Sequence, residues 1–326
     1  MKLIIQIPCY NEEETLPVTL SELPKSVPGV DRVETLIIDD GSADETSRVA
    51  REHGVDHVLA FRAHRGLAAA FSAGIMESLR LGADIIVNTD ADNQYRASDI
   101  PALIRPILEG QADVVVGDRR NGRNRDFSFL KRWLQKYGSA LVCFLSGIRI
   151  PDTTSGFRAF SREAALRMNI LTDYSYTLES LIQLGHMKFN ILSVPVGVNR
   201  PLRRSKLMKN SVAYLASQAG TIIRVYTIYR PLRTFFILGA LFALPGVLAL
   251  ARYVAHLAAG RGGEHVHGLI LSAVFLVSGA LICVFGLVAD LVGGLRKLTE
   301  NALFRIKRLE LEEAAERDRP DKGRPC

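Results

Sequence analysis

The chain has 326 residues, a formal net charge of +7 and a pI near 9.3. This length has room for one sizeable α/β domain and a smaller part. The positive net charge makes nucleic acid a possible type of partner. No basic patch interleaved with aromatic residues accompanies the cations, however, so we expect no nucleic-acid binding. The four cysteines lack CxxC or metal spacing, which indicates neither a disulfide framework nor a zinc site.

Short apolar runs alternate with helical patterns in the first part of the chain. Residues 3–7 are too short an apolar run for a signal peptide and predict a first strand, so we expect this part to stay in the cytosol. Further strands are predicted at residues 33–38, 58–61, 85–88, 114–117 and 189–198. Helices are predicted at residues 13–23, 44–53, 67–81 and 97–109. This alternation predicts an α/β fold with a mostly parallel sheet and a nucleotide-type site at its carboxyl edge.

Two acids and an amide follow the apolar run at residues 85–88. Asp90, Asp92 and Gln94 lie two residues apart, so in an extended chain their side chains project to one side. Three oxygen donors suit Mg²⁺ or Mn²⁺, which takes one or two carboxylates from a protein and leaves other positions to water and phosphates. A polar turn after a strand explains the Asp-x-Asp pattern alone equally well.

Acids also follow the predicted second strand. Asp39 and Asp40 are placed to contact a ribose hydroxyl or a base N–H, whereas Ser42 or Asp44 is placed to cap the next helix. The alternative is that the whole group forms only a turn and a helix cap. Simple packing at a strand end is likewise the alternative for the residues that follow the first strand.

Two clusters of cations, at residues 119–132 and 200–209, lie near the predicted anionic site in the sequence. Arginine offers bidentate geometry to phosphate, so the clusters suggest phosphate binding. For the second cluster the alternative is a solvated basic loop lying on anionic lipid headgroups.

The composition changes after residue 231. Residues 235–255 and 269–289 are apolar and each is about long enough to span a bilayer as a helix. Cations precede the first run and follow the second, so the positive-inside bias places both ends in the cytosol. Residues 211–229 have helical apolar spacing with few charges, which favours a helix in the membrane interface over a core helix. The tail from residue 310 is charged and predicts a solvated helix that ends in disorder.

The predicted organisation therefore has four parts. They are a cytosolic catalytic domain at residues 1–206, interface helices at 207–233, two transmembrane helices at 234–292 and a charged cytosolic tail at 293–326.

Six short motifs follow one another along the chain. They are Pro8-Cys9-Tyr10-Asn11-Glu12, Ile38-Asp39-Asp40-Gly41-Ser42, Asp90-Ala91-Asp92-Asn93-Gln94, Val116-Gly117-Asp118-Arg119, Ser155-Gly156-Phe157-Arg158 and Ser205-Lys206. Together they resemble the family 2 glycosyltransferases with a GT-A fold, and within them the branch of dolichyl-phosphate mannose synthases and polyprenyl-phosphate glycosyltransferases. Each motif is weak alone, but six in this order make the resemblance specific over residues 3–206.

The resemblance implies a role for each matching residue. The nucleoside pocket would be lined by Pro8, Tyr10, Glu12, Asp39, Asp40 and Asp90. The divalent metal would be held by Asp90, Asp92 and Gln94. The phosphate of a lipid acceptor would be bound by Arg119, Lys131, Arg132, Arg158, Arg200 and Lys206. Asp152 lies where inverting members carry an acid near the reacting centre, so the implied catalytic residues are Asp152, Arg119 and Asp92.

Two departures from the family pattern concern the acceptor and sugar pockets. Arg204 stands where the family usually has a small residue beside Ser-Lys, and His64-Arg65-Gly66 stands where members often have an Asn before Gly-Leu or Gly-Lys. No Gln-x-x-Arg-Trp element occurs, so the chain does not resemble the processive cellulose or hyaluronan synthases.

The resemblance implies an inverting enzyme that moves one sugar from a UDP- or GDP-sugar to a polyprenyl phosphate at the cytosolic membrane face, with Mg²⁺ or Mn²⁺. One alternative keeps the fold but glycosylates a hydroxyl-bearing lipid. Another is a non-catalytic membrane module of a glycan-export system, against which the intact Asp-x-Asp pattern speaks. A soluble-type nucleotidyltransferase is disfavoured, because it would not need two membrane spans. Glycines in the predicted spans suggest a homo-oligomer.

Overall fold

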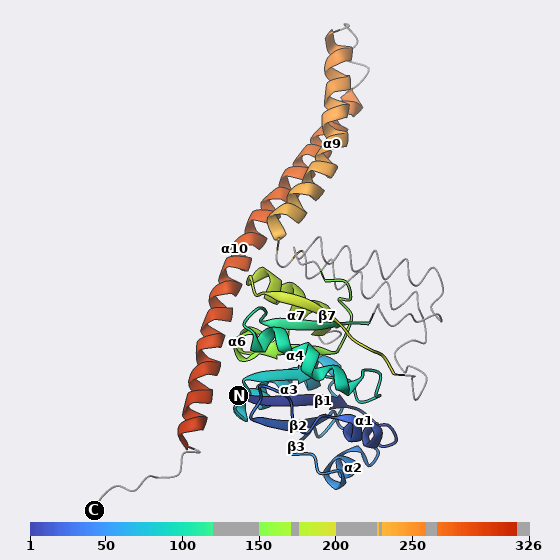
Figure 1. Cartoon of the computed structure of the whole chain (residues 1–326). Helices are drawn as coiled ribbons and strands as arrows, with labels where there is room; N and C mark the ends of the chain where they lie inside the picture. The colour runs from blue at the N-terminus through green and yellow to red at the C-terminus, as the bar shows by residue number, and fades with distance from the viewer. Residues whose placement is uncertain (120–149, 171–175, 200–226, 228–229, 259–265, 318–326) are drawn as a thin grey trace, which may run out of the picture. The chain divides into compact units, whose positions relative to one another are not determined.

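The computed structural model describes residues 1–119, 150–170, 176–199, 227, 230–258 and 266–317 (Figure 1). The chain divides into two compact units. The first unit comprises Met1–Ala216 together with Leu303–Cys326, and the second comprises Ser217–Ala302.

The first unit is built on a seven-stranded sheet with the order β3-β2-β1-β4-β6-β5-β7. The strands are β1 (Lys2–Cys9), β2 (Arg32–Asp39), β3 (His57–Ala60), β4 (Ile85–Asn88), β5 (Val114–Asp118), β6 (Arg158–Ser161) and β7 (Ile191–Pro195). Only β6 runs antiparallel to its neighbours, so the prediction of a mostly parallel α/β sheet is confirmed.

Helices cover both faces of this sheet (Figure 1). They are α1 (Leu16–Glu22), α2 (Thr46–Glu52), α3 (Leu67–Arg80), the 3₁₀ turn η1 (Ala97–Asp99), α4 (Ile100–Leu108), α6 (Arg162–Arg167) and α7 (Tyr176–His186). In β1, Leu3 and Ile5 pack with α1, α2 and α4 on one face, whereas Ile4 packs with α3, α6 and α7 on the other. Burial on both faces explains why β1 reads as a continuous apolar run.

The structure differs from the sequence prediction at several elements. Strand β6 was not predicted. The helix after it, α6, is capped by Ser161, whose hydroxyl accepts a hydrogen bond from the Ala164 amide. The predicted helix at 97–109 is η1 followed by α4, with Pro106 inside the helix. The predicted interface helix at 211–229 lies almost wholly outside the described residues.

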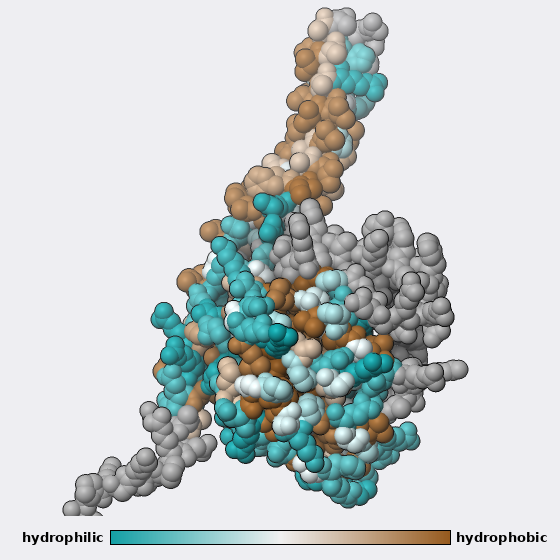
Figure 2. Space-filling view, viewed as in Figure 1, coloured by the Kyte–Doolittle hydropathy of each residue, from teal (hydrophilic) through white to brown (hydrophobic). Residues whose placement is uncertain are grey.

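The second unit contains two helices, α9 (Pro231–Ala258) and most of α10 (Val266–Arg317), that are long and apolar enough to cross a membrane. They pack closely at glycines: a Cβ added to Gly239 would lie 2.5 Å from Cys283 Sγ, and one added to Gly286 would lie 2.7 Å from Phe235 Cβ. Large apolar side chains cover the visible outer surface of the pair (Figure 2). These glycines therefore serve packing within one chain.

The end of α10, from Leu303, belongs to the first unit. Phe304 and Leu311 pack against the core on the α3 face of the sheet, and the Arg167 guanidinium lies 4.2 Å from the Phe304 ring centroid. Lys307 Nζ donates to the Met168 carbonyl and, at 2.7 Å, to Asn169 Oδ1. Burial lowers the pKa of Lys307. The end of α10 is thus docked through one apolar edge, whereas Glu310, Glu312 and Glu313 are exposed, which fits the solvated helix predicted from residue 310.

We expect Phe304→Ala to lower the stability of the first unit by roughly 2 kcal/mol, below the cost for a fully buried Phe, because the ring is only half-buried. The thermal unfolding midpoint of the full chain in detergent measures this. Leu309→Ala, on the exposed side of the same helix, is the matched control and should leave the midpoint unchanged. Equal midpoints for the two variants would show that the docked edge of α10 contributes nothing to the stability of the first unit.

Candidate active site

Four parallel strands of the first unit end at one edge of the sheet. Cys9 of β1 is opposite Asp39 of β2, and β4 and β5 run in the same direction. The residues that follow these strands therefore meet there: Tyr10, Asp40, Asp90 and Arg119. The edge is the candidate active site.

The two acids after β2 hold loops in place. Asp40 accepts hydrogen bonds from the amides of Arg65 and Gly66, at 2.7 and 2.9 Å, and pairs with His64 Nδ1 at 2.9 Å. Asp39 Oδ1 accepts the Ser42 amide at 2.9 Å. The turn and cap alternative therefore describes much of what these carboxylates do.

An aromatic surface stands beside Asp40. The rings of Tyr10 and His64 stack with their centroids 4.0 Å apart, and Tyr10 is 40% exposed. Gly41, at φ +70°, lets the loop after β2 lie close to the backbone that precedes His64, because a Cβ at Gly41 would lie 2.5 Å from the Ala63 carbonyl carbon. The exposed stacked pair offers a face for a planar ring such as a nucleobase.

The other residues predicted to line the nucleoside pocket are near Tyr10 or Asp40 in sequence. Pro8 is buried within β1, where it packs in the sheet. Glu12 accepts the Thr15 hydroxyl at 2.7 Å, and its amide donates to Thr46 Oγ1. Asp44 Oδ1 accepts the Thr46 amide at 3.1 Å beside the start of α2, although the N-cap residue itself is Glu45, which makes no capping hydrogen bond with its side chain. Glu12 and Asp44 therefore join the loops after β1 and β2.

Asp90 and Asp92 form a carboxylate pair without matched cations. Among the described residues none donates a hydrogen bond to Asp90, whereas Asp92 Oδ1 accepts only the Gln94 amide, at 3.1 Å. Burial, then the charge of Asp92, raises the pKa of Asp90 to about 7. Two adjacent carboxylates with few hydrogen-bond donors around them fit a hard divalent cation. The described part of the chain contains no third His, Cys, Asp or Glu for such a group, so phosphate and water would complete the coordination.

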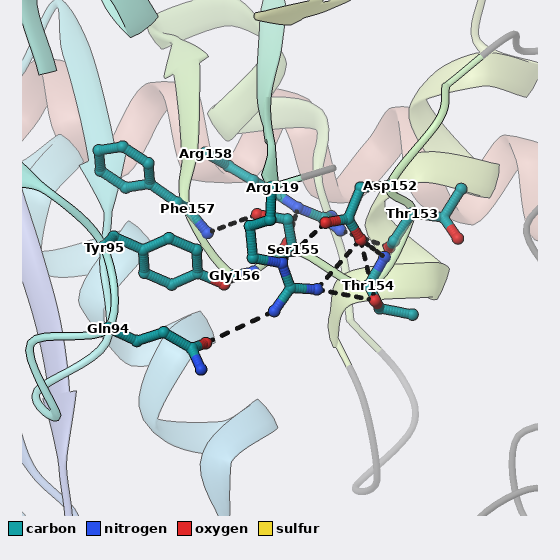
Figure 3. Close-up of polar contacts among 10 residues, drawn as sticks. All are labelled: Gln94, Tyr95, Arg119, Asp152, Thr153, Thr154, Ser155, Gly156, Phe157 and Arg158. Carbon is teal, nitrogen blue, oxygen red and sulfur yellow. Dashed lines mark hydrogen bonds and ion pairs between the residues drawn. The ribbon is translucent and has the colours of Figure 1, made fainter. Parts of the chain in front are cut away.

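The side chain of Gln94 points towards Arg119. Its Oε1 lies 3.5 Å from Arg119 Nη1 (Figure 3). A contact of this length is weak, so the role of Gln94 as a metal ligand stays a prediction.

Arg119 and Asp152 form a two-pronged ion pair, with Nε to Oδ2 at 2.7 Å and Nη2 to Oδ1 at 3.1 Å (Figure 3). Arg119 Nη2 also donates to Thr154 Oγ1 at 3.0 Å. Burial would raise the pKa of the Asp152 carboxyl, but the hydrogen bonds and charge of Arg119 outweigh it and lower that pKa. Asp152 is therefore ionised at neutral pH and orients the guanidinium.

Arg158 is fully buried, and the structure argues against its predicted contact with the acceptor phosphate. Its guanidinium donates to the carbonyls of Thr153, Ser155 and Thr177, at 2.8, 2.8 and 2.6 Å, and to Ser180 Oγ. Burial lowers the pKa of Arg158 to about 10. The side chain ties the loop before β6 to α7 and does not reach a ligand.

Sequence reasoning missed a row of buried polar groups beneath the site. Gln6 Nε2 donates to Asn88 Oδ1, and Asn88 Nδ2 donates to the Gly156 carbonyl and the Tyr176 hydroxyl. The Gly156 amide donates to the Tyr95 hydroxyl at 2.9 Å (Figure 3). An amide side chain inside an otherwise apolar strand was the one available signal for this row.

Gly156 lets the loop before β6 approach the carboxylate pair. A Cβ there would lie 3.0 Å from Asp90 Oδ1 and 3.0 Å from the Tyr176 hydroxyl. A larger residue in place of this glycine of the Ser-Gly-Phe-Arg motif would therefore press on Asp90 and Tyr176. The remaining predicted phosphate ligands lie outside the described residues: Lys131, Arg132, Arg200 and Lys206.

We expect Arg158→Met to destabilise the protein by about 3 kcal/mol or more, because it leaves several buried carbonyl oxygens without a hydrogen-bond donor. The thermal unfolding midpoint is the measurement. Arg105→Met removes an exposed arginine of α4 that pairs with Glu109 and should leave the midpoint unchanged. A stable Arg158→Met protein that has lost only acceptor binding would restore the phosphate role.

The chain is similar in sequence to a known protein family and to named relatives. Residues 4–167 match the model of Glycosyl transferase family 2. An undecaprenyl-phosphate mannosyltransferase of Micrococcus luteus is 30% identical over 219 residues, covering 64% of this chain and 88% of that protein. An undecaprenyl-phosphate 4-deoxy-4-formamido-L-arabinose transferase of Proteus mirabilis is 28% identical over 301 residues, covering 90% and 88%.

A solved structure is similar in fold. Glucosyl-3-phosphoglycerate synthase of Mycobacterium tuberculosis, crystallised with Mn²⁺, UDP and glucosyl-3-phosphoglycerate, superposes with a TM-score of 0.54 at 21% identity, covering 69% of this chain and 78% of that one. The α/β unit thus has the GT-A fold. With the family model matching half of the sequence, the chain belongs to glycosyltransferase family 2.

Proposed function

We propose that the protein transfers one sugar from a UDP- or GDP-sugar to the phosphate of a polyprenyl phosphate. The observation that carries the proposal is the Arg119–Asp152 pair beside the Asp90 and Asp92 carboxylates, on a chain with two apolar helices. A guanidinium suits an anionic acceptor, a carboxylate pair suits a metal–diphosphate, and the helices suit a lipid. The relatives from Micrococcus luteus and Proteus mirabilis are both named for undecaprenyl phosphate.

The donor would lie across the carboxyl edge of the sheet. Its base would stack on Tyr10 and His64, and its diphosphate would lie towards Asp90 and Asp92. Two carboxylates would repel a diphosphate, so the site needs an added cation. Mg²⁺ or Mn²⁺ held by Asp90 and Asp92 would supply positive charge that stabilises the leaving diphosphate.

The acceptor phosphate would bind Arg119 at Nη1, whose 3.5 Å contact with Gln94 is weak enough to be replaced. Asp152 and Thr154 hold the rest of the guanidinium in position. An acceptor phosphate oxygen would form a bond to the anomeric carbon while the bond from that carbon to the donor diphosphate breaks. The diphosphate would leave with the bonding electron pair. This single displacement inverts the anomeric configuration, which NMR of the product can check.

The orientation in the membrane is part of the proposal. Arg230 and Arg233 lie at the start of α9, and Arg296 and Lys297 follow the apolar part of α10. The positive-inside bias would place these cations, the catalytic unit and both termini in the cytosol.

We expect purified protein to transfer label from a UDP- or GDP-sugar into undecaprenyl phosphate, in a reaction that needs Mn²⁺ or Mg²⁺. EDTA should abolish transfer, and Asp92→Asn should reduce it at least about 100-fold, because a carboxylate next to the diphosphate is lost. Asp31→Asn, at an exposed ion pair with the N-terminus, is the control. Transfer only to a phosphate-free lipid alcohol would show that the acceptor is a hydroxyl-bearing lipid. Absence of sugar-nucleotide binding would favour a non-catalytic module.

We expect the pH profile to follow the acceptor phosphate. Although burial acts the other way, the hydrogen bonds and charge of Arg119 lower the pKa of Asp152, so this carboxylate is ionised throughout the neutral range. At saturating metal, kcat/KM should fall below about pH 6 as the acceptor gains its second proton. Asp152→Asn should lower kcat without moving that limb. A limb that disappears in the variant would make Asp152 a general base.

A further inference from the structure

Helix α1 contacts both the loop after β1 and residues 90–93, which we call the carboxylate turn. The Leu16 amide donates to the Glu12 carbonyl at 2.9 Å, and the Thr15 hydroxyl donates to Glu12 Oε2 at 2.7 Å. Leu16 is fully buried and belongs with Ala91 to one core cluster. The start of α1 is therefore fixed to the loop that carries the exposed ring of the stacked aromatic pair.

A buried threonine of α1 binds the carboxylate turn. Thr19 is 4% exposed, and its hydroxyl donates to the Ala91 carbonyl at 2.9 Å, 72 positions along the chain. A threonine hydroxyl inside a helix commonly bonds to the carbonyl four residues earlier, which here is that of Thr15, at 3.3 Å. The single proton of the hydroxyl serves the nearer acceptor. Ala91 separates Asp90 from Asp92, so this bond fixes the backbone between the two carboxylates.

A second side chain of α1 binds the same turn on the other side of Asp92. Glu22 Oε1 accepts a hydrogen bond from Asn93 Nδ2 at 3.0 Å, and Asn199 Nδ2 donates to Glu22 Oε2 at 3.2 Å. Asn93 is buried, with a φ of 54° that few residues other than Gly, Asn or Asp adopt. Residues three apart in a helix share a face, so Thr19 and Glu22 hold the turn before and after Asp92 from one side of α1.

These contacts act against the repulsion within the carboxylate pair. Two neighbouring carboxylates repel each other, and the repulsion favours any arrangement of the turn that separates them. A turn that other groups hold in place presents its oxygens to a cation without first having to be ordered.

We propose that Thr19 and Glu22 are positioning residues, which hold Asp90 and Asp92 ready for a divalent cation at a set distance from the loop that would bind the base. Neither side chain touches a ligand in this scheme. The inference rests on the proposed function, because it needs a metal–nucleotide at this edge of the sheet.

The place of α1 between the two parts of the site predicts which ligand depends on it. A metal-bound nucleoside diphosphate would meet the stacked aromatic pair and the carboxylates together, so its affinity depends on how the two are spaced, as for any ligand with two linked binding groups. The same nucleotide without a metal depends on the loop after β1 alone. Loss of the α1 contacts should therefore weaken the contribution of the metal and leave metal-free binding near its original value.

The test measures the Kd of UDP, or of GDP if UDP does not bind, on the full chain in detergent, once with saturating Mn²⁺ and once with EDTA. The factor by which Mn²⁺ lowers the Kd gives the contribution of the metal. Thr19→Val removes the hydroxyl at nearly constant shape and should reduce this factor about ten-fold, the lower end of what residues that orient metal ligands contribute. Glu22→Ala, at an exposed position, should reduce it at least about three-fold.

Two control variants separate the hydrogen bond from packing. Thr19→Ser keeps the hydroxyl and should keep the wild-type factor. Ser21→Ala removes an exposed hydroxyl of the same helix, which bonds to the Val18 carbonyl, and should also keep it. A loss of stability alone would change both Kd values alike and leave the factor unchanged.

The outcomes distinguish the inference from the proposed function. An unchanged factor in both Thr19→Val and Glu22→Ala overturns the inference and leaves the proposed function standing. A factor that falls as far in Thr19→Ser as in Thr19→Val assigns the effect to packing and also overturns the inference. A wild type that binds no nucleotide, or whose Kd responds to neither Mn²⁺ nor Mg²⁺, overturns the proposed function and the inference with it.

Discussion

The buried guanidinium of Arg158 is the interaction on which the candidate site depends. Removing a charged group from water is costly, and only several charge-assisted hydrogen bonds offset that cost. Thr153, Ser155 and Thr177 supply the carbonyl acceptors. Two of these carbonyls flank Asp152 and Gly156 in sequence, so the same bonds that solvate the arginine also hold the ion-pairing carboxylate and the close-packed glycine in position.

The charges around this loop are unevenly matched. Asp152 has Arg119 as a close partner, and both are held by hydrogen bonds. Asp90 and Asp92 have no comparable partner among the described residues, and burial together with their mutual repulsion raises the pKa of Asp90 to about 7. A protein that only needed a stable turn would not gain from this arrangement. The raised pKa marks a place where a ligand's charge lowers the free energy.

The sequence predicted the elements whose pattern follows from burial, and missed those whose partners are distant. Buried parallel strands read as apolar runs, so β1, β2, β4 and β5 and the polar residues after them could be placed. Strand β6 is four residues long and begins with an arginine, so no pattern marked it. Arg158 itself was assigned to phosphate, because a motif gives a residue type and not its burial. The docking of α10 through Phe304 was not predicted, because the apolar edge of the helix is narrow among many charges.

The identity of the donor base depends on groups that the motifs do not mark. Stacking on the exposed ring of Tyr10 would contribute affinity for any base, since every base has a π face. Distinguishing uracil from guanine requires hydrogen bonds to the edge of the ring. Both oxygens of Asp40 already accept hydrogen bonds from amides of the Arg65–Gly66 turn, and His64 adds an ion pair. In the proposed donor pose, discrimination between bases would therefore fall to the edge of His64 and the neighbouring backbone, in the His64-Arg65-Gly66 segment where this chain departs from the family pattern.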